Sequence, residues 1–251
     1  MRWSTIILCS LLLFLLIAPL FGLHDPNSTQ PAIQMQPPSL DHLLGTDFLG
    51  RDVFSRLIYG GQRTLLITLL AALLAIVIGS SIGLAAGMAS SWLDAILSTI
   101  INALLAIPNL LLALVFLTLF GAGASPLIFV TGFTQIAPVA QIIRGATRSV
   151  LAQPYVEAGY AIGLQRWHLL IYYVLPNIRN ILMSYSTVTL SYCLFNNAAL
   201  SYLGFNGEPG IADWGIMLAE GRNTLSDAPW VAIAPGVAIT LTIWSINQLF
   251  E

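Results

Sequence analysis

The chain has 251 residues, of which 57% are hydrophobic and only 8% are charged, whereas about 25% of residues are charged in an ordinary soluble domain. All nine basic residues are arginine and the net charge is −2, so the composition excludes a disordered chain and argues against a nucleic-acid-binding protein. We therefore expect a protein of the lipid bilayer. Because a P-loop needs a lysine, which this chain lacks, any ATP would be bound by another subunit.

Long charge-free runs mark the expected membrane spans, because a charge at the bilayer centre costs about 2.5–3.5 kcal/mol. The longest run is too long for one helix and predicts a hairpin that turns at 121–126, where Gly, Ser and Pro gather. The first run is expected to be a retained helix, because residues 19–22 form a poor signal-peptide cleavage site. The six predicted spans are 4–23, 64–93, the two arms of 95–143, 180–207 and 228–250.

Six spans place both termini on one side of the membrane. With that side cytoplasmic, the inside segments carry five arginines and a net charge of +2, and the outside segments carry four arginines and a net charge of −4. The positive-inside rule counts basic residues, so it supports this orientation only weakly. The predicted fold class is thus an all-α polytopic membrane protein with cytoplasmic termini. We divide it into 1–63, the first helix plus an extracytoplasmic segment, and 64–251, a five-helix core with a cytoplasmic loop at 144–178.

Gly79, Gly83 and Gly87 share one face of the second predicted span at four-residue spacing. Small residues on one face let another helix approach closely. We therefore expect a helix–helix contact there, although glycine is also common in membrane helices and the sequence does not say which helix packs on it.

The loop 144–178 is long for a helix bundle and its pattern predicts further helix. Pro154 is suited to a first helical position and Glu157 would lie in the first turn, where the helix dipole favours an acid. Gly163 is suited to ending this helix. A short helix on the cytoplasmic face is either a docking surface for a partner or an amphipathic helix at the membrane interface.

This segment closely resembles the EAA motif of ABC importer permeases, which is Glu-Ala-Ala, three residues, Gly, nine residues, Ile, one residue and Leu-Pro. The spacing is matched throughout, with Gly159 in place of the second alanine and Tyr173 where isoleucine is usual. The resemblance implies that the residues that couple the chain to an ATPase are Glu157, Ala158, Gly159, Gly163, Leu175 and Pro176.

Three further stretches, 42–57, 200–218 and 228–236, are similar to segments of the second permease subunit in dipeptide, oligopeptide and nickel importers. The resemblance implies a Type I importer fold and a non-catalytic subunit of the bacterial cytoplasmic membrane. It also implies a second permease subunit, two ATPase subunits that bind ATP and Mg²⁺, and an extracytoplasmic binding protein. No cofactor is expected in this chain, and the substrate would be a peptide, nickel or a metal chelate. The alternative function is a passive channel or a facilitator that is not driven by ATP.

Polar residues inside spans are costly and often functional. The candidates for the translocation path are Asn102, Asn109, Ser191, Asn196 and Asn197, each of which could instead form hydrogen bonds between helices. No ionisable side chain lies deep in a predicted span, which disfavours proton-coupled transport.

Two groups of polar residues fall in the first outside segment. His24 and His42 are close to acids, so a metal site is conceivable in a nickel system, but solvated loop histidines are favoured and no metal site is predicted. The charged residues between Asp47 and Arg56 recur at three- and four-residue spacing, which suggests pairing on a short surface helix. Their role is contact with a binding protein or structural pairing.

Overall fold

The computed structural model describes residues 2–207 and 210–249, which are largely helical. The β-type pairing in these ranges is an isolated bridge between Thr46 and Asp52, so the all-α prediction is confirmed. The α-helices are α1 (Arg2–Ile17), α2 (Val53–Met88), α3 (Ser91–Leu105), α4 (Asn109–Phe120), α5 (Ala124–Leu151), α6 (Pro154–Ala161), α7 (Arg166–Leu169), α8 (Leu175–Tyr202), α9 (Trp214–Arg222) and α10 (Trp230–Asn247). Short 3-10 helices are η1 (Ala18–Phe21) and η2 (Pro31–Ile33), and η3 (Leu170–Val174) is a π-helix.

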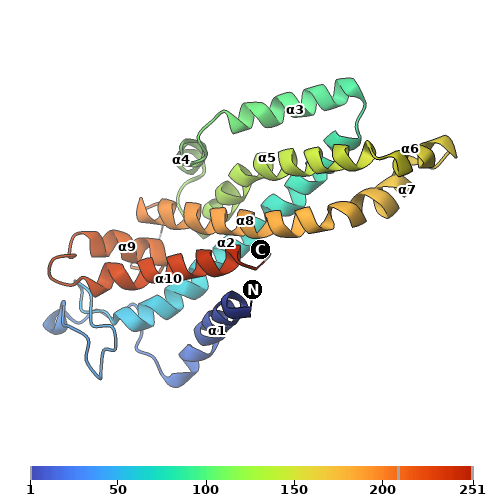
Figure 1. Ribbon diagram of the computed structural model, residues 1–251. Coiled ribbons are helices and arrows are strands. Elements are labelled where there is room, and N and C mark those ends of the chain that lie inside the picture. The colour runs from blue at the N-terminus through green and yellow to red at the C-terminus, as the bar shows by residue number, and fades with distance from the viewer. Residues whose placement is uncertain (1, 208–209, 250–251) are drawn as a thin grey trace.

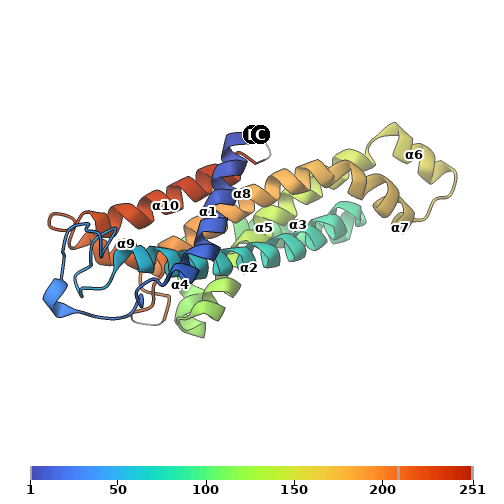
Figure 2. The same cartoon turned by 90° about the horizontal axis from the view of Figure 1, so that it is seen from below.

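The molecule is an elongated bundle with two different ends (Figures 1 and 2). The helices α6 and α7 project from one end, which we call the coupling end. The opposite end, which we call the outer end, holds α9 and the segment 24–52 that links α1 to α2. The start of α1 and the end of α10 lie near one another between these two ends. The loop predicted to face the cytoplasm and the segments predicted to lie outside are therefore at opposite ends of the molecule.

The most extensive helix pair is α2 with α5. A Cβ atom on Gly83 would lie 2.6 Å from the carbonyl oxygen of Ala140, and one on Gly79 would lie 2.7 Å from Cβ of Val139. At these distances only glycine lets the two backbones touch. The predicted close contact at the glycine face is confirmed, and the partner helix belongs to this same chain.

The predicted hairpin turns where the sequence places it, because α4 ends at Phe120 and α5 begins at Ala124. Its first arm differs from the prediction, since it is not one helix. The axes of α3 and α4 meet at 88° across a short break that contains Pro108. Proline cannot donate the backbone hydrogen bond that would continue α3, which explains why the apolar run is divided there.

Three of the described helices, α2, α5 and α10, are long and apolar enough to cross a membrane, and the bent pair α3–α4 would make a fourth span. The helix α1 is apolar but has only 16 residues, and α8 has 28 residues with many polar side chains. The six-span count and the cytoplasmic termini stay predictions. The division at 63/64 falls inside α2, which is continuous from Val53 to Met88.

Candidate functional site

The coupling end is built from α6, α7 and η3, which connect α5 to α8. Pro154 occupies the first turn of α6, and the carbonyl oxygen of Gln153 accepts hydrogen bonds from the backbone N–H groups of Val156 (3.0 Å) and Glu157 (3.2 Å). Proline suits this position because its missing N–H has no partner in a first turn. The predicted helix, with Glu157 in its first turn, is therefore present.

Gly163 ends α6 in a left-handed conformation, with φ of +85°. Its N–H donates to the carbonyl oxygen of Tyr160 at 3.0 Å, and the N–H of Leu164 donates to that of Gly159 at 3.1 Å. This pair of bonds is a Schellman motif, which closes a helix and reverses the chain direction. A Cβ on Gly163 would meet nothing within 4 Å, so glycine is favoured there by its backbone conformation alone.

The inner face of α6 packs on α7. Val156 and Leu169 are fully buried, and Gly159 is buried between them and the turn. A Cβ on Gly159 would lie 3.2 Å from the side-chain ends of both Leu164 and Leu169. Glycine, where the family pattern has alanine, therefore lets α6 and the following chain pack slightly closer.

Leu175 and Pro176 form the joint between this segment and α8. They are in the first turn of α8, and the N–H of Leu175 donates to the carbonyl oxygen of Leu170 across a π-helical turn. A π-turn adds one residue to the helical repeat and is often found at functional sites. Tyr173, the departure from the usual isoleucine, stacks on Tyr155 of α6 with ring centroids 6.1 Å apart.

The outer face of α6 is open. Glu157 and Ala158 are both exposed, and beside them Tyr160 and Ile162 expose 45% and 78% of their surface. A small residue next to an acid, surrounded by apolar side chains, offers a close-fitting surface to another protein. The six predicted coupling residues thus lie on one helix, its cap and its joint to α8.

An ion-pair cluster fixes α5 shortly before it leads into α6. The carboxylate of Asp94 on α3 accepts hydrogen bonds from Nε of Arg144 at 2.6 Å and Nη2 of the same residue at 2.8 Å. Arg148, one turn further along α5, pairs with the same carboxylate. A forked pair of this kind fixes orientation as well as distance, so the C-terminal part of α5 is held rigidly against α3.

At the outer end, two arginines and two acids form a buried charge cluster. Arg51 Nε lies 2.6 Å from Oδ2 of Asp47, and both side chains are 1% exposed. Oε2 of Glu220 on α9 accepts hydrogen bonds from Nη2 of Arg51 at 2.8 Å and Nη2 of Arg56 at 3.0 Å. The expected pairing between Asp47 and Arg51 exists, but the short surface helix was wrong. Arg56 belongs to α2, Asp47 and Arg51 belong to the preceding loop, and all three are buried.

Thr64 of α2 forms hydrogen bonds with residues of α8 and of the N-terminal end of α9. Its hydroxyl donates to Oδ2 of Asp213 at 2.9 Å and accepts from the N–H of Trp214 at 3.1 Å. Asp213 also caps α9 by accepting from the N–H of Gly215 at 2.9 Å. Burial raises the pKa of the Asp213 carboxyl above its usual range, because the desolvation of its charge outweighs these hydrogen bonds.

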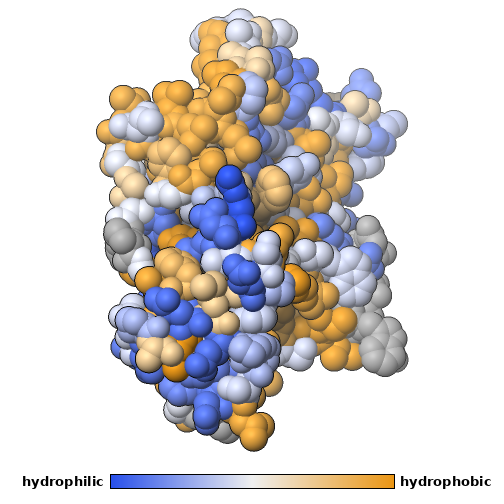
Figure 3. Space-filling view, turned by 90° about the vertical axis from the view of Figure 1, so that its left-hand side faces the viewer, coloured by the Kyte–Doolittle hydropathy of each residue, from blue (hydrophilic) through white to orange (hydrophobic). Residues whose placement is uncertain are grey.

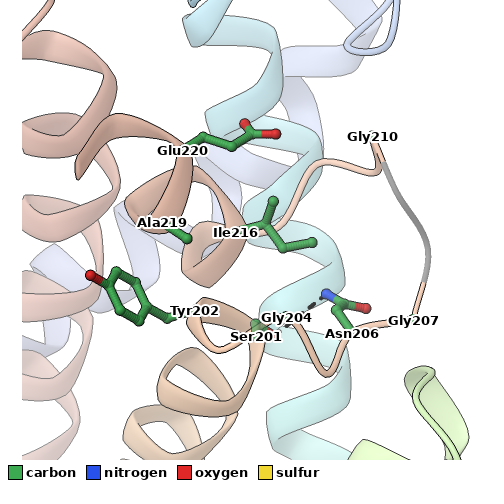
Figure 4. A pocket seen from close by; sticks show the side chains of 9 residues that line it. All are labelled: Ser201, Tyr202, Gly204, Asn206, Gly207, Gly210, Ile216, Ala219 and Glu220. Atoms are coloured by element: carbon green, nitrogen blue, oxygen red, sulfur yellow. Dashed lines mark hydrogen bonds between the residues drawn. The ribbon is translucent and has the colours of Figure 1, made fainter. Parts of the chain in front are cut away.

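A pocket of about 390 Å³ opens between the end of α8, the loop after it and α9 (Figure 4). Glu220 lies on one side of it, and Ser201 and Asn206 lie on the other, joined by a 3.4 Å hydrogen bond. Figure 3 faces the outer end and shows hydrophilic residues gathered over its centre and lower left, with hydrophobic residues above and to the right.

Sequence reasoning missed Glu220 and Asp213, because their partners are far away along the chain.

The five path candidates do not lie on one helix. Asn102 is exposed on α3 and Asn109 is half-buried on α4, whereas the other three are on α8. Nδ2 of Asn197 donates to the carbonyl oxygen of Thr64 at 3.3 Å, which is an inter-helix contact. The hydroxyl of Ser191 donates to Oδ1 of Asn247 on α10 at 2.9 Å. Ser191 and Asn247 both line an open groove of about 480 Å³.

The chain is a helical bundle with a short helix pair that projects from one end (Figure 1). It shares this fold with two solved transporters, "Inward facing conformations of the MetNI methionine ABC transporter: CY5 native crystal form" and "Crystal structure of an amino acid ABC transporter with histidines". The TM-scores are 0.64 and 0.57, the identities 20% and 21%, and 78% of this chain is covered in each case, with 94% and 90% of the solved chains. These similarities concern the fold.

Residues 79–251 match the model of the family described as "Binding-protein-dependent transport system inner membrane component". The chain belongs to this family and is a permease component of an ABC importer of the inner membrane. It is 32% identical to "Probable D,D-dipeptide transport system permease protein DdpC" of Escherichia coli (strain K12), over 97% of this chain and 82% of that protein. It is 34% identical to "Glutathione transport system permease protein GsiD" of Escherichia coli O1:K1 / APEC, over 84% and 70%.

Proposed function

We propose that this chain is the non-catalytic half of a peptide-importing permease pair and that α6 couples it to an ATPase subunit. The observation that carries the proposal is the arrangement at the coupling end. Glu157 and Ala158 face outward on a helix whose direction is fixed by the Gly163 turn and by the packing of Val156. A passive channel, the alternative considered from the sequence, would have no use for this rigid projection.

The coupling is a difference in binding between two states. ATP binding in the partner would draw α6 to one position, and because α5 is fixed to α3 through Asp94, the movement would pass into the bundle instead of being absorbed by the loop. The π-turn before Pro176 would carry the same movement into α8. ATP and Mg²⁺ would be bound in the two ATPase subunits and this chain would need no cofactor.

We propose peptides as the substrate class, because the two relatives cited above are named as permeases for D,D-dipeptide and glutathione transport. We further propose that Asn102, Asn109, Ser191, Asn196 and Asn197 line the path formed with a second permease subunit. The open groove beside Ser191 supports this for α8. A polar path without fixed charges suits a permease whose selectivity resides in an extracytoplasmic binding protein.

The test is reconstitution in lipid vesicles. The chain alone should neither bind nor hydrolyse ATP, whereas the complex with the second permease and the ATPases should hydrolyse it faster when peptide-loaded binding protein is added. Glu157→Lys should abolish that stimulation, because it places a cation at the positive end of α6 and in the docking surface. Hydrolysis by the isolated chain, or full stimulation in the Glu157→Lys complex, would contradict the proposal.

A further inference from the structure

Two histidines and an aspartate meet at the outer end, away from the coupling segment. Nδ1 of His42 lies 2.9 Å from Oδ1 of Asp52, and the rings of His24 and His42 have centroids 5.1 Å apart. One potential ligand atom from each of the three residues lies within 4.8 Å of the other two. Two imidazoles and a carboxylate form a donor set suited to Zn²⁺ or Ni²⁺.

The three residues come from separate parts of the outer end: the chain after α1, the loop before α2, and the N-cap of α2. They line a small cavity of about 80 Å³, to whose wall Asp25 adds a second carboxylate. This volume is enough for an ion with bound water, because a cavity needs only about 10–15 Å³ to hold one water molecule. It is too small for a peptide or a metal chelate as cargo.

Hydrogen bonds to backbone carbonyl groups hold the segments that carry the three residues in place. The N–H of Gln30 donates to the carbonyl oxygen of Leu49 at 3.0 Å, and Nη1 of Arg56 donates to the carbonyl oxygen of Pro26 at 3.2 Å. These bonds fasten the chain that carries His24 to the loop that leads to Asp52. The site is therefore largely ordered before an ion binds. Ordering is the main cost when a flexible segment binds a ligand, so this cost is small here.

The ligand atoms are close to the spacing that an ion would impose. Ligand atoms at about 2.0–2.2 Å from Zn²⁺ are about 3–4 Å apart. The hydrogen bond between Nδ1 of His42 and Oδ1 of Asp52 is slightly shorter, at 2.9 Å, so an ion would replace its proton and move the two atoms slightly apart. His24 is exposed and can turn inward, whereas His42 and Asp52 have side chains only 13% and 4% exposed. Oδ2 of Asp52 accepts from the N–H of Ser55 at 2.7 Å, which leaves Oδ1 on the side of the histidines.

We propose that His24, His42 and Asp52 bind a divalent transition-metal ion that fastens the 24–52 segment to the start of α2. The ion would be resident and not transported. The expectation from sequence was solvated histidines, because nothing in the local pattern indicates that residues 18 positions apart adopt this arrangement. The inference rests on the geometry of these three residues and is independent of the coupling function.

The test uses the full chain in lipid nanodiscs after treatment with a chelator, titrated with Zn²⁺ in competition with a fluorescent chelator. We expect each chain to bind one Zn²⁺ ion tightly. His24→Gln and His42→Gln should each weaken binding at least about 10-fold. Asp52→Asn should also weaken it while keeping the helix cap, because asparagine caps as well as aspartate. His168→Gln, the same substitution at the coupling end, is the matched control and should leave the affinity unchanged.

A second measurement does not depend on how the variants fold. Histidine modification by diethylpyrocarbonate, mapped by mass spectrometry on the wild-type chain, should be suppressed by Zn²⁺ at His24 and His42 and unchanged at His168. Wild-type affinity in both outer histidine variants, equal weakening in His168→Gln, or no protection of His24 and His42 would overturn the metal site.

Discussion

The two ends of the molecule are held by different kinds of interaction. At the coupling end, α6 is fixed by local features: a proline in its first turn, a Schellman turn at Gly163, and the close approach of Gly159 to Leu169 of α7. At the outer end, Arg51 and Glu220 are far apart in sequence and meet in a buried charge cluster. The proposed docking helix α6 is thus held by short-range contacts, whereas the outer end depends on long-range ones.

The largest expected effect comes from breaking the long-range cluster. Arg51→Met leaves Asp47 buried without its closest partner, and removing one member of a buried ion pair costs about 3–5 kcal/mol. Arg166→Met, at the exposed coupling end, should change the free energy of unfolding by no more than about 0.5 kcal/mol. The measurement is unfolding in mixed micelles with increasing SDS. Equal losses of unfolding free energy in Arg51→Met and Arg166→Met would contradict the difference proposed between the two ends.

A smaller loss of stability is expected from a substitution in the middle of the bundle, between the two ends. Gly83→Ala places a Cβ 2.6 Å from the carbonyl oxygen of Ala140, a backbone atom that cannot move aside cheaply. Overpacking of this kind costs about 1–3 kcal/mol. Gly145→Ala on α5 is the control, because its Cβ would meet nothing within 4 Å and alanine is the better helix former. The same unfolding assay should show opposite signs for the two variants.

Asp213, the N-cap of α9, should make the stability of the outer end depend on pH. Asp213→Ala should lose about 0.5–2 kcal/mol, because the amides of Gly215 and Ile216 lose their acceptor. Asp213→Asn keeps an acceptor. Since burial raises the pKa of Asp213, its contribution to stability is present below the unfolded value of about 3.9 and is lost as pH rises through the native pKa.

The wild type should therefore lose stability relative to Asp213→Asn as pH increases from about 4. The unfolding midpoint of each variant, followed against pH, checks this. Parallel curves for the wild type and Asp213→Asn would mean that the carboxyl is not desolvated in the native state.

Orientation is predicted from charge alone and has a direct test. In a background without Cys9 and Cys193, a cysteine at Gln30 or at Leu225, which is 53% exposed, should react with an impermeant reagent added outside cells. A cysteine at Tyr160 should react only in inverted vesicles. Labelling of residue 160 from outside would contradict the predicted orientation and would place the coupling end on the side of the membrane away from the ATPases.

Local patterns were predictable from the sequence and long-range partners were not. Pro154, Gly163 and Pro176 act through their own backbones, so their spacing predicted a helix, its end and a joint. The Gly79–Gly87 face predicted a close contact, but not its partner. Pro108 is equally visible in the sequence, but the prediction of a hairpin in 95–143 includes no break at this residue, although proline removes a backbone donor. The hydrogen bond of Asn197 to Thr64 and the meeting of His24 with His42 depend on folding of distant segments.

The central claim is that the turn at Gly163 sets the direction of α6 for an ATPase partner. Position 163 allows a clean test, because a side chain there has free space and only the left-handed backbone opposes it. Gly163→Val should cost roughly 1–2 kcal/mol in that conformation and misdirect α6, whereas Gly163→Asn should be tolerated, since asparagine adopts it more readily.

The measurement is peptide uptake together with co-purification of the ATPase subunits and of the binding protein. We predict that Gly163→Val inserts normally and still binds the binding protein at the outer end, but loses the ATPases and transport, and that Gly163→Asn keeps most of both. Wild-type uptake and ATPase retention in Gly163→Val would contradict the account and leave α6 as an interfacial helix without a coupling role.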